Sequence, residues 1–380
     1  MTKNKTALYV HWPFCSSRCS YCDFRAFPHQ EKRIPAYAQA LSEEIRLRKK
    51  TDGTDRLTSL YFGGGTPSHI PAAYLEAVMQ TVTASFQIEA GAERTIEANP
   101  EDISPDFTAR IHALGFNRVS LGMQTFDSAI AAKIGRRHTK EDAVRAVRCL
   151  KENGIDNISV DLMTGLPGQT PDTVREDMQI LATLPVTHLS VYALTLAPGT
   201  YLHRRHKENP TSFPDEAQER RMAHLAAREA EKVGLSRYEI SNFSRPGKAS
   251  RHNLTYWKLG SYTGVGLSAA SYADGVHTKN TDSLRLYLER IAAGELPVEE
   301  EEILDTRALL LELLLTGLRL KEGVCLKEMY ERTGIDMANE KQTVLRGWEA
   351  RGMLQMRGSR IAVTGRGADL LDALLLDLMP

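Results

Sequence analysis

The sequence predicts an α/β protein in which a partial (β/α)6 barrel precedes a small C-terminal α+β domain of winged-helix type. Two observations predict the barrel: short β-rich runs alternate with longer amphipathic segments up to about residue 200, and most of these runs end in polar, cysteine or glycine residues. A third observation predicts the second domain, because helical segments after residue 303 lead into two short β-rich runs. A chain of 380 residues with 42% hydrophobic residues is long enough to bury both cores.

The strands and helices of the barrel follow from this alternation in chain order. Strands are expected at residues 7–12, 57–65, 94–100, 117–124, 157–168 and 187–194. Helices are expected at residues 35–50, 71–86, 104–115, 140–154 and 170–184. Because parallel strands need a long crossover between them, the series predicts a parallel sheet with helices outside it.

The ends of the predicted strands carry residues suited to chemistry. They are Cys15, the glycines at 63–65, Glu97, Gln124 and Asp161. Ligands of α/β sheets and barrels bind at the carboxyl ends of the strands. We therefore expect these residues to gather at one edge of the sheet.

The alternation loosens in the second half of the chain. We expect a helix at 215–234, a strand at 238–243 and a glycine- and aromatic-bearing segment at 244–272. The acidic run at 295–304 is expected to be a linker or a solvated face. The expected division is a barrel domain at 1–240, a connecting segment at 241–302 and a C-terminal domain at 303–380.

Charge and composition narrow the classes of partner and compartment. Lys plus Arg and Asp plus Glu balance at 48 each, and the arginines of the C-terminal domain are offset by glutamates, so nucleic-acid binding is not expected. The N-terminal apolar run is too short for a signal peptide, and no apolar run reaches 18 residues, which predicts a cytoplasmic protein. In that reducing compartment five cysteines are not expected to form disulfides.

Three of these cysteines form a cluster with the spacing C-x3-C-x2-C at Cys15, Cys19 and Cys22. A structural zinc site normally has four ligands in two pairs, so a zinc reading needs a further ligand such as His11. A redox C-x-x-C pair leaves Cys15 without a role. An iron–sulfur cube held by three thiolates keeps one iron free for another ligand. Cys149 and Cys325 lie in predicted helices and are expected to be small apolar residues.

The cysteine spacing after the first strand, together with the glycine turn FGGGTPS after the second, resembles the radical S-adenosylmethionine superfamily. The resemblance implies a 4Fe–4S cluster on the three cysteines, with S-adenosylmethionine bound to the fourth iron. It also implies an adenine contact at Tyr21 and ribose hydrogen bonds at Glu97. The contacts it implies for the amino group of the cofactor are Gly64, Gly65 and Thr66.

A narrower resemblance rests on YVHWPFC, SLGMQTF, GRRH and DLMTGLPGQT, which are similar to the oxygen-independent coproporphyrinogen III oxidase-like family over nearly the whole chain. It adds Tyr9, Gln124, Arg136 and Asp161 to the cofactor region, where a second S-adenosylmethionine or a tetrapyrrole is expected.

Two departures separate the chain from the oxidase itself. Phe24 stands where the oxidase has a fourth cysteine, and only eight residues precede Tyr9. Both features, and HNLTYW at 252–257, resemble the sister group of heme chaperones. The imidazole of His252 is then a candidate axial ligand of heme, with His11, His138 and His206 as rivals.

This second resemblance implies that the chain binds heme and delivers it to hemoproteins such as respiratory enzymes, with peripheral contact at the inner face of the membrane and without oxidase activity. Three alternatives stay open: a true coproporphyrinogen III oxidase, a radical enzyme acting on another substrate, and a non-enzymatic zinc module. The sequence also leaves open whether the chain forms a homodimer.

Overall fold

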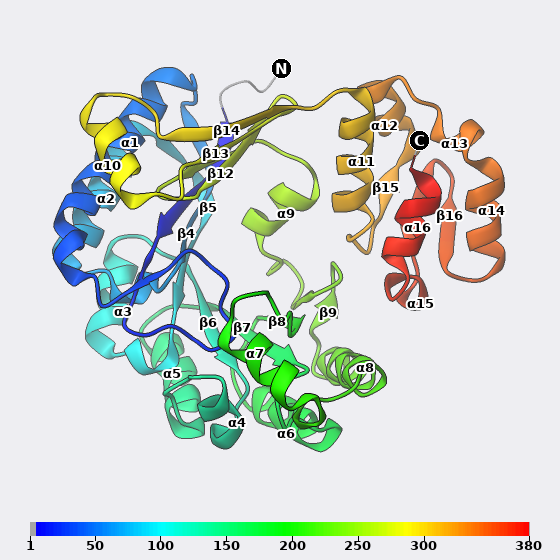
Figure 1. The fold of residues 1–380 in the computed structure, drawn as a ribbon, viewed down its shortest axis with the longest axis horizontal. Helices are drawn as coiled ribbons and strands as arrows, with labels where there is room; N and C mark the ends of the chain where they lie inside the picture. The colour runs from blue at the N-terminus through cyan, green and yellow to red at the C-terminus, as the bar shows by residue number, and fades with distance from the viewer. Residues whose placement is uncertain (1–4, 380) are drawn as a thin grey trace.

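The computed structural model describes residues 5–379 and contains a central sheet of twelve strands in the order β14-β13-β12-β11-β1-β4-β5-β6-β7-β8-β10-β9. The strands from β11 to β8 in this order run parallel to one another, and the strands outside them are antiparallel. Figure 1 shows the sheet curving into an open barrel with helices on its outer side. The predicted fold class is confirmed.

The barrel is built from six strands at the predicted places, although the third begins at residue 87 rather than 94 and the fifth ends at residue 164 rather than 168. They are β1 (Lys5–Trp12), β4 (Arg56–Gly64), β5 (Gln87–Ala98), β6 (Arg118–Gln124), β7 (Asn157–Thr164) and β8 (His188–Ala193). The outer helices are α1 (Ile34–Thr51), α2 (Ala72–Ser85), α3 (Pro105–Ala113), α4 (Ser128–Lys133), α5 (Lys140–Glu152) and α6 (Pro171–Ala182). Two further helices, α7 (Tyr201–Glu208) and α8 (Glu216–Lys232), follow β8.

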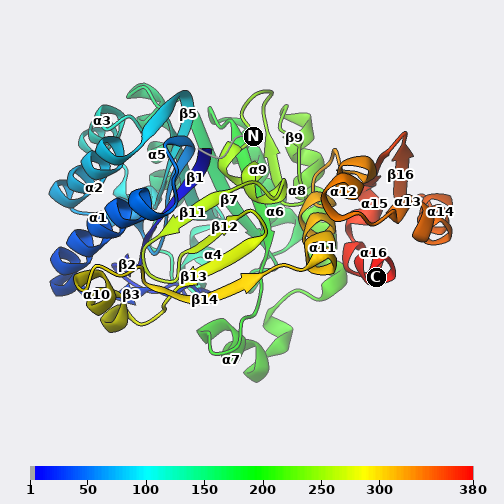
Figure 2. The same ribbon diagram turned by 90° about the horizontal axis from the view of Figure 1, so that it is seen from above.

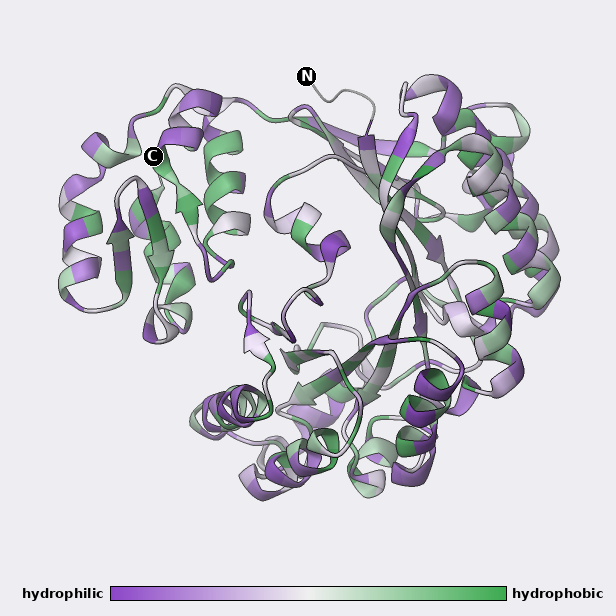
Figure 3. Cartoon of the chain, turned by 180° about the vertical axis from the view of Figure 1, so that it is seen from behind, coloured by the Kyte–Doolittle hydropathy of each residue, from purple (hydrophilic) through white to green (hydrophobic). Residues whose placement is uncertain are grey.

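Each barrel strand presents one face to the outer helices and one to the interior. On β6 the outward residues Val119, Leu121 and Met123 are fully buried in the main hydrophobic core, which lies between the sheet and the helices. The inward residues of the same strand, Arg118 and Ser120 among them, are polar. Because side chains alternate along a strand, this pattern gives the barrel a hydrophobic outside and a polar inside. Figure 3 shows the matching mixture of hydrophobic and hydrophilic residues along the outer helices.

The connecting segment completes both edges of the sheet. Its strands are β10 (Asn242–Ser244), β11 (Tyr262–Val265), β12 (Ala270–Ala273), β13 (Val276–Asn280) and β14 (Val298–Ile303). On one side of the sheet β10 pairs with β8. On the other side β11 pairs parallel to β1 and begins a meander through β14, which Figure 2 shows. Between the two edges, α9 (Arg251–Trp257) crosses the barrel, and α10 (Leu284–Ala292) packs against α1.

A buried polar cluster fixes this added meander to α1. The carboxylate of Glu44, fully buried, accepts hydrogen bonds from the Gly266 N–H, the Asn280 amide and the Tyr287 hydroxyl at 2.7 Å each. The guanidinium of Arg48 lies 3.7 Å from the same carboxylate. These partners compensate the carboxylate of Glu44 inside the core, where burying an unpaired carboxylate would cost much free energy.

Two predictions for the second half need correction. Only the end of the strand expected at 238–243 is a strand: residues 238–241 form the turn between two short strands, β9 (Ser236–Arg237) and β10, and residues 242–243 belong to β10. Side chains hold this turn, because Arg237 donates to the Ile240 carbonyl and Glu239 accepts from the Ser241 N–H at 2.8 Å. The acidic run is not a linker: its residues 298–303 form β14, an edge strand with exposed glutamates, so the expected solvated face is present.

The C-terminal domain has its own hydrophobic core, formed by helices around a three-stranded sheet in the order β15-β17-β16. The helices are α11 (Thr306–Gly317), α12 (Leu326–Thr333), α13 (Met337–Glu340), α14 (Gln342–Ala350), α15 (Gly365–Ala368) and α16 (Leu371–Leu378). The strands are β15 (Val324–Cys325), β16 (Leu354–Arg357) and β17 (Arg360–Val363). The domain touches the barrel at α9, where the Arg319 guanidinium lies 4.5 Å from the centre of the Trp257 ring.

Within residues 5–379, no helix has the length and apolar content needed to cross a membrane.

Candidate functional site

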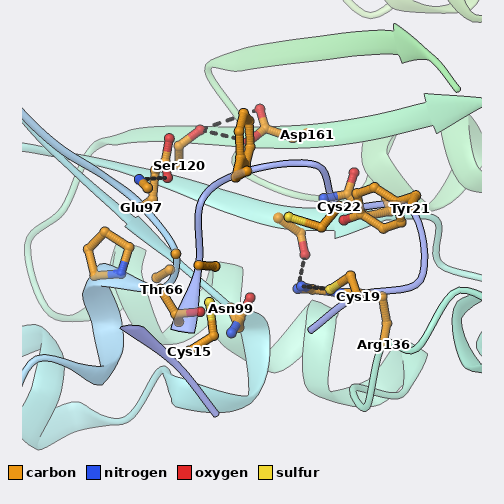
Figure 4. A pocket seen from close by; sticks show the side chains of 18 of the residues that line it. Cys15, Cys19, Tyr21, Cys22, Thr66, Glu97, Asn99, Ser120, Arg136 and Asp161 are labelled. Carbon is orange, nitrogen blue, oxygen red and sulfur yellow. Dashed lines mark hydrogen bonds between the residues drawn. The ribbon is translucent and has the colours of Figure 1, made fainter. Parts of the chain in front are cut away.

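A cavity of about 410 Å³ opens at the carboxyl ends of the barrel strands. We call it the barrel cavity. Its wall is formed by the loop after β1, the glycine turn after β4 and the inward residues of β5 to β8. Figure 4 shows the three clustered cysteines, Thr66 and Glu97 around this space. The predicted gathering of strand-end residues is therefore present.

The loop after β1 supplies the thiols of Cys15, Cys19 and Cys22, all of them free and half-buried. Burial raises the pKa of Cys15 and raises that of Cys22 to about 11. The Arg136 guanidinium lies 3.6 Å from the Cys19 sulfur, where it is suited to stabilise a thiolate. Among the described residues, no three His, Cys, Asp or Glu side chains lie close enough together to hold a single metal ion.

The glycine turn lets the backbone approach this loop closely. A Cβ on Gly65 would lie 2.8 Å from the Cys15 sulfur and 2.7 Å from the Phe14 carbonyl oxygen. Gly64 has a φ of 116°, and a Cβ there would lie 2.7 Å from the His11 ring. Three soft thiol donors around one cavity, backed by a turn without side chains, fit the iron–sulfur cluster expected from the sequence.

Glu97, at the end of β5, lies beside this turn and faces the cavity. Its carboxylate accepts hydrogen bonds from the Tyr61 hydroxyl at 2.7 Å and the Gly64 N–H at 3.2 Å. Burial, with a smaller contribution from nearby Asp161, raises the pKa of Glu97 to about 7. The carboxyl group is therefore placed to exchange hydrogen bonds with hydroxyl groups of a bound molecule.

The opposite wall comes from β6 and β7. Arg136 donates to the Gly122 carbonyl as well as contacting Cys19, so it joins β6 to the cysteine loop. Gln124 has a φ of 67°, a left-handed conformation that is uncommon outside glycine. Asp161, with its pKa raised by burial, accepts a hydrogen bond from the Ser120 hydroxyl at 3.1 Å.

A buried carboxylate on α6 fixes the backbone just after Gln124. Asp177 accepts hydrogen bonds from the Phe126 N–H at 2.7 Å and the Thr125 hydroxyl at 2.9 Å. Burial raises the pKa of Asp177 to about 7. This carboxylate supports the strained turn from behind and does not line the barrel cavity.

Two predicted site residues lie outside the barrel cavity. The Tyr9 hydroxyl lies 3.0 Å from the His11 Nδ1, and its ring stacks on Tyr61. His252 is buried on α9, where its Nδ1 lies 2.9 Å from the Ser59 hydroxyl and its Nε2 lies 2.7 Å from the Tyr256 hydroxyl. Burial lowers the pKa of His252 to about 3. Both ring nitrogens are engaged in this conformation, so the ligand role of His252 stays a prediction.

The rival histidines have different surroundings. His11 and His138 are buried, and burial lowers the pKa of each to about 4. His206, on α7, packs edge-on against the Phe213 ring with 5.1 Å between ring centres.

The motifs missed several cavity residues that the strand pattern could have revealed. Every second residue of β6, β7 and β8 faces the barrel cavity, including Ser120, Ser159 and Ser190. Adjacent strands place Glu97, Ser120, Ser159 and His188 in one row across the sheet. The signal was the alternation of polar and apolar residues in these strands, which predicts a polar barrel interior. Asn253, from α9, also lines the cavity, but no local sequence pattern predicts this position.

Comparison with known families gives two matches along the chain. The model of the radical SAM superfamily matches residues 9–181, and the model of the HemN C-terminal domain matches residues 304–370. The first match covers the barrel from β1 to α6, and the second covers most of the C-terminal domain.

Relatives and a solved structure match over nearly the full length. The heme chaperone HemW of Bacillus subtilis is 32% identical over 94% of this chain and 95% of its own. The mitochondrial radical S-adenosyl methionine domain-containing protein 1 of Mus musculus is 33% identical over 99% and 88%. The structure of coproporphyrinogen III oxidase (HemN) of Escherichia coli superposes with a TM-score of 0.88 at 22% identity, covering 99% of this chain and 90% of that chain, and shows a shared fold. The chain belongs to the radical SAM superfamily and, within it, to the HemW family.

Proposed function

We propose that the protein holds a 4Fe–4S cluster on Cys15, Cys19 and Cys22, binds S-adenosylmethionine in the barrel cavity, and carries heme to hemoproteins. The observation that carries this proposal is the convergence of three free thiols and a glycine turn on one cavity at the strand ends. The HemW relatives are named heme chaperones, which supports the proposed transport of heme.

The cluster, when bound, supplies one-electron chemistry to S-adenosylmethionine. The chain supplies ligation, orientation and exclusion of water. The three cysteines would hold the irons, and Arg136 would offset their negative charge at Cys19. Tyr21, a partly buried cavity residue, would pack against the adenine.

The remaining cavity residues divide between the ends of the cofactor. Gly64, Gly65 and Thr66 would lie against its amino group, since the turn leaves room for a close approach there. Glu97 would bond the ribose hydroxyls. Gln124 and Asp161 line the other side of the cavity. They would contact the same S-adenosylmethionine, a second molecule of it, or a tetrapyrrole. Tyr9 would act from behind this set, through its stacking on Tyr61.

For heme we propose His252 as the axial ligand in a heme-bound conformation. The imidazole has a low pKa and is therefore neutral, as iron ligation requires. Ligation through Nε2 would require the Tyr256 hydroxyl, four residues along the same helix, to release this nitrogen. Phe24, 63% exposed at the cavity mouth in place of the fourth cysteine of the oxidase, supports a carrier over an oxidase.

Heme titration of the anaerobically reconstituted protein tests this proposal. Cys19→Ser is expected to lose the cluster, whereas His252→Ala is expected to keep the cluster and lose heme binding. Tyr256→Phe frees Nε2 and is expected to bind heme more tightly. The control His112→Ala, an exposed histidine on α3, is expected to match wild type. Wild type that binds no heme would end the heme proposal, and unchanged binding in His252→Ala and Tyr256→Phe would end the ligand assignment.

The shared fold with the oxidase makes oxidation of coproporphyrinogen III the second candidate function. Reduced, reconstituted protein given coproporphyrinogen III and S-adenosylmethionine is expected to yield no protoporphyrinogen. Steady turnover in this assay would replace the carrier function with an enzymatic one.

As recipients of heme we propose respiratory enzymes, which the protein would reach by peripheral contact with the membrane.

A further inference from the structure

Two cavity-lining turns are tied together behind the barrel cavity by Ser68, His69 and Asp102. The first turn, Pro67–His69, follows the glycines after β4, and the second, Pro100–Asp102, follows β5. The Asp102 carboxylate accepts a hydrogen bond from the Ser68 hydroxyl at 2.6 Å and lies 3.0 Å from the His69 Nε2. The Ser68 hydroxyl in turn accepts from the Asn99 N–H at 3.3 Å.

These contacts lie directly behind the residues that face the cavity. Thr66 and Pro67 line it just before Ser68, and Asn99 and Glu101 line it just before Asp102. The backbone also closes each turn on itself, because the His69 N–H donates to the Thr66 carbonyl and the Asp102 N–H donates to the Asn99 carbonyl. A displacement of either turn would therefore move cavity residues of both.

We propose that Ser68, His69 and Asp102 form a positioning clamp that sets the turn after β4 and the turn after β5 at the spacing required to grip S-adenosylmethionine. The clamp rests on the proposed binding of this cofactor. Its three members are positioning residues, because none of them lines the barrel cavity.

The surroundings of His69 and Asp102 favour the protonated imidazole and the ionised carboxylate. The hydrogen bond to Asp102 raises the pKa of His69, with Glu101 adding to the shift and Arg137 opposing it. Burial alone would raise the pKa of Asp102, but the hydrogen bonds from His69 and Ser68 outweigh it and lower that pKa. The clamp is thus strongest below the raised pKa of His69 and weakens as the pH rises through it.

The test measures the dissociation constant of S-adenosylmethionine on the reconstituted protein without reductant, so that the cofactor stays intact, and iron content beside it. His69→Ala and Asp102→Ala are expected to weaken binding by about five- to tenfold with iron content unchanged. Ser68→Ala is expected to have a smaller effect of the same kind. The matched control is His224→Ala, because His224 forms the same kind of pair with Asp369 at 3.0 Å, away from the cavity.

A pH series separates positioning from simple structural support. His69→Gln keeps a hydrogen-bond donor without a titrating charge. Relative to this variant, wild type is expected to lose affinity as the pH rises through the pKa of His69, while the titration of Glu97 contributes equally to both. Parallel pH profiles with equal affinities, or loss of iron in the clamp variants, would overturn the clamp. A wild type that holds the cluster but binds no S-adenosylmethionine would instead overturn the proposed function.

Discussion

Replacing Gly65 by alanine tests the contact between the glycine turn and the cysteine loop. The backbone of Gly65 has no positive φ, so the substitution acts through the added methyl group alone. That methyl would lie 2.8 Å from the Cys15 sulfur, 2.7 Å from the Phe14 carbonyl oxygen and 3.0 Å from the Pro13 carbonyl carbon, whereas ordinary van der Waals contact begins at 3.4 Å. Two of the three atoms belong to the backbone and have little room to move.

The expected cost has two measurable parts. Overpacking of this kind lowers the free energy of unfolding by about 1–3 kcal/mol, which chemical denaturation of the cluster-free protein measures. Displacement of the Cys15 sulfur is expected to reduce the iron and sulfide bound after anaerobic reconstitution well below the wild-type level.

A matched control is available on α14. Gly347 also lacks a positive φ, and a Cβ there would meet nothing within 4 Å. Because it lies inside a helix, Gly347→Ala is expected to leave iron content unchanged and to raise the free energy of unfolding by up to about 1 kcal/mol. Wild-type iron content together with wild-type stability in Gly65→Ala would refute the close approach of the glycine turn to the cysteine loop.

Three further predictions concern carboxylates. Glu97→Gln is expected to weaken S-adenosylmethionine binding by about tenfold and leave iron content unchanged, as binding assays and metal analysis would show. Asp177 has a folded pKa of about 7, above its ordinary value of 3.8, so its contribution to stability is complete below about pH 4 and is lost as the pH rises to about 7. In denaturation at several pH values, the stability of wild type relative to Asp177→Asn should therefore fall with rising pH, by at most about 1.4 kcal/mol per unit; a constant difference would contradict the buried, protonated state. Glu44→Ala leaves Arg48 buried without this carboxylate and is expected to lower the free energy of unfolding by about 3–5 kcal/mol. The control Glu43→Ala removes a half-buried neighbour in a surface ion pair and is expected to cost about 0–1 kcal/mol. Equal losses in these two variants would show that the buried cluster is not stabilising.

Much of the barrel could be predicted from the sequence because its signals are local. The apolar and polar residues of β6 and β7 alternate, and the helices between strands repeat their apolar residues at helical spacing. The cysteine loop and the glycine turn are contiguous motifs, so they too could be recognised without a structure. The fold class predicted from the alternation is confirmed, and the roles of the two motifs stay predictions.

The parts of the fold that could not be predicted depend on contacts between residues far apart in the sequence. YEISNF has the pattern of a strand, but its first four residues form a turn whose backbone is bonded by the side chains of Arg237 and Glu239, and only its last two belong to β10. Nothing near residue 252 indicates that α9 enters the barrel, because its partners Ser59 and Glu93 lie far earlier in the chain. The pairing of β11 with β1 likewise has no local signal.

That pairing has a consequence for biosynthesis. β1 is translated before both of its neighbours: β4 follows soon afterwards, but β11 begins only at Tyr262. Until Val265 has been translated, the strand that leads into the cysteine loop keeps one unpaired edge, the kind of surface on which nascent chains aggregate. The first parallel strand of the sheet can therefore be completed only late in synthesis, and a ribosome that stalls before Val265 would leave this edge open to other chains.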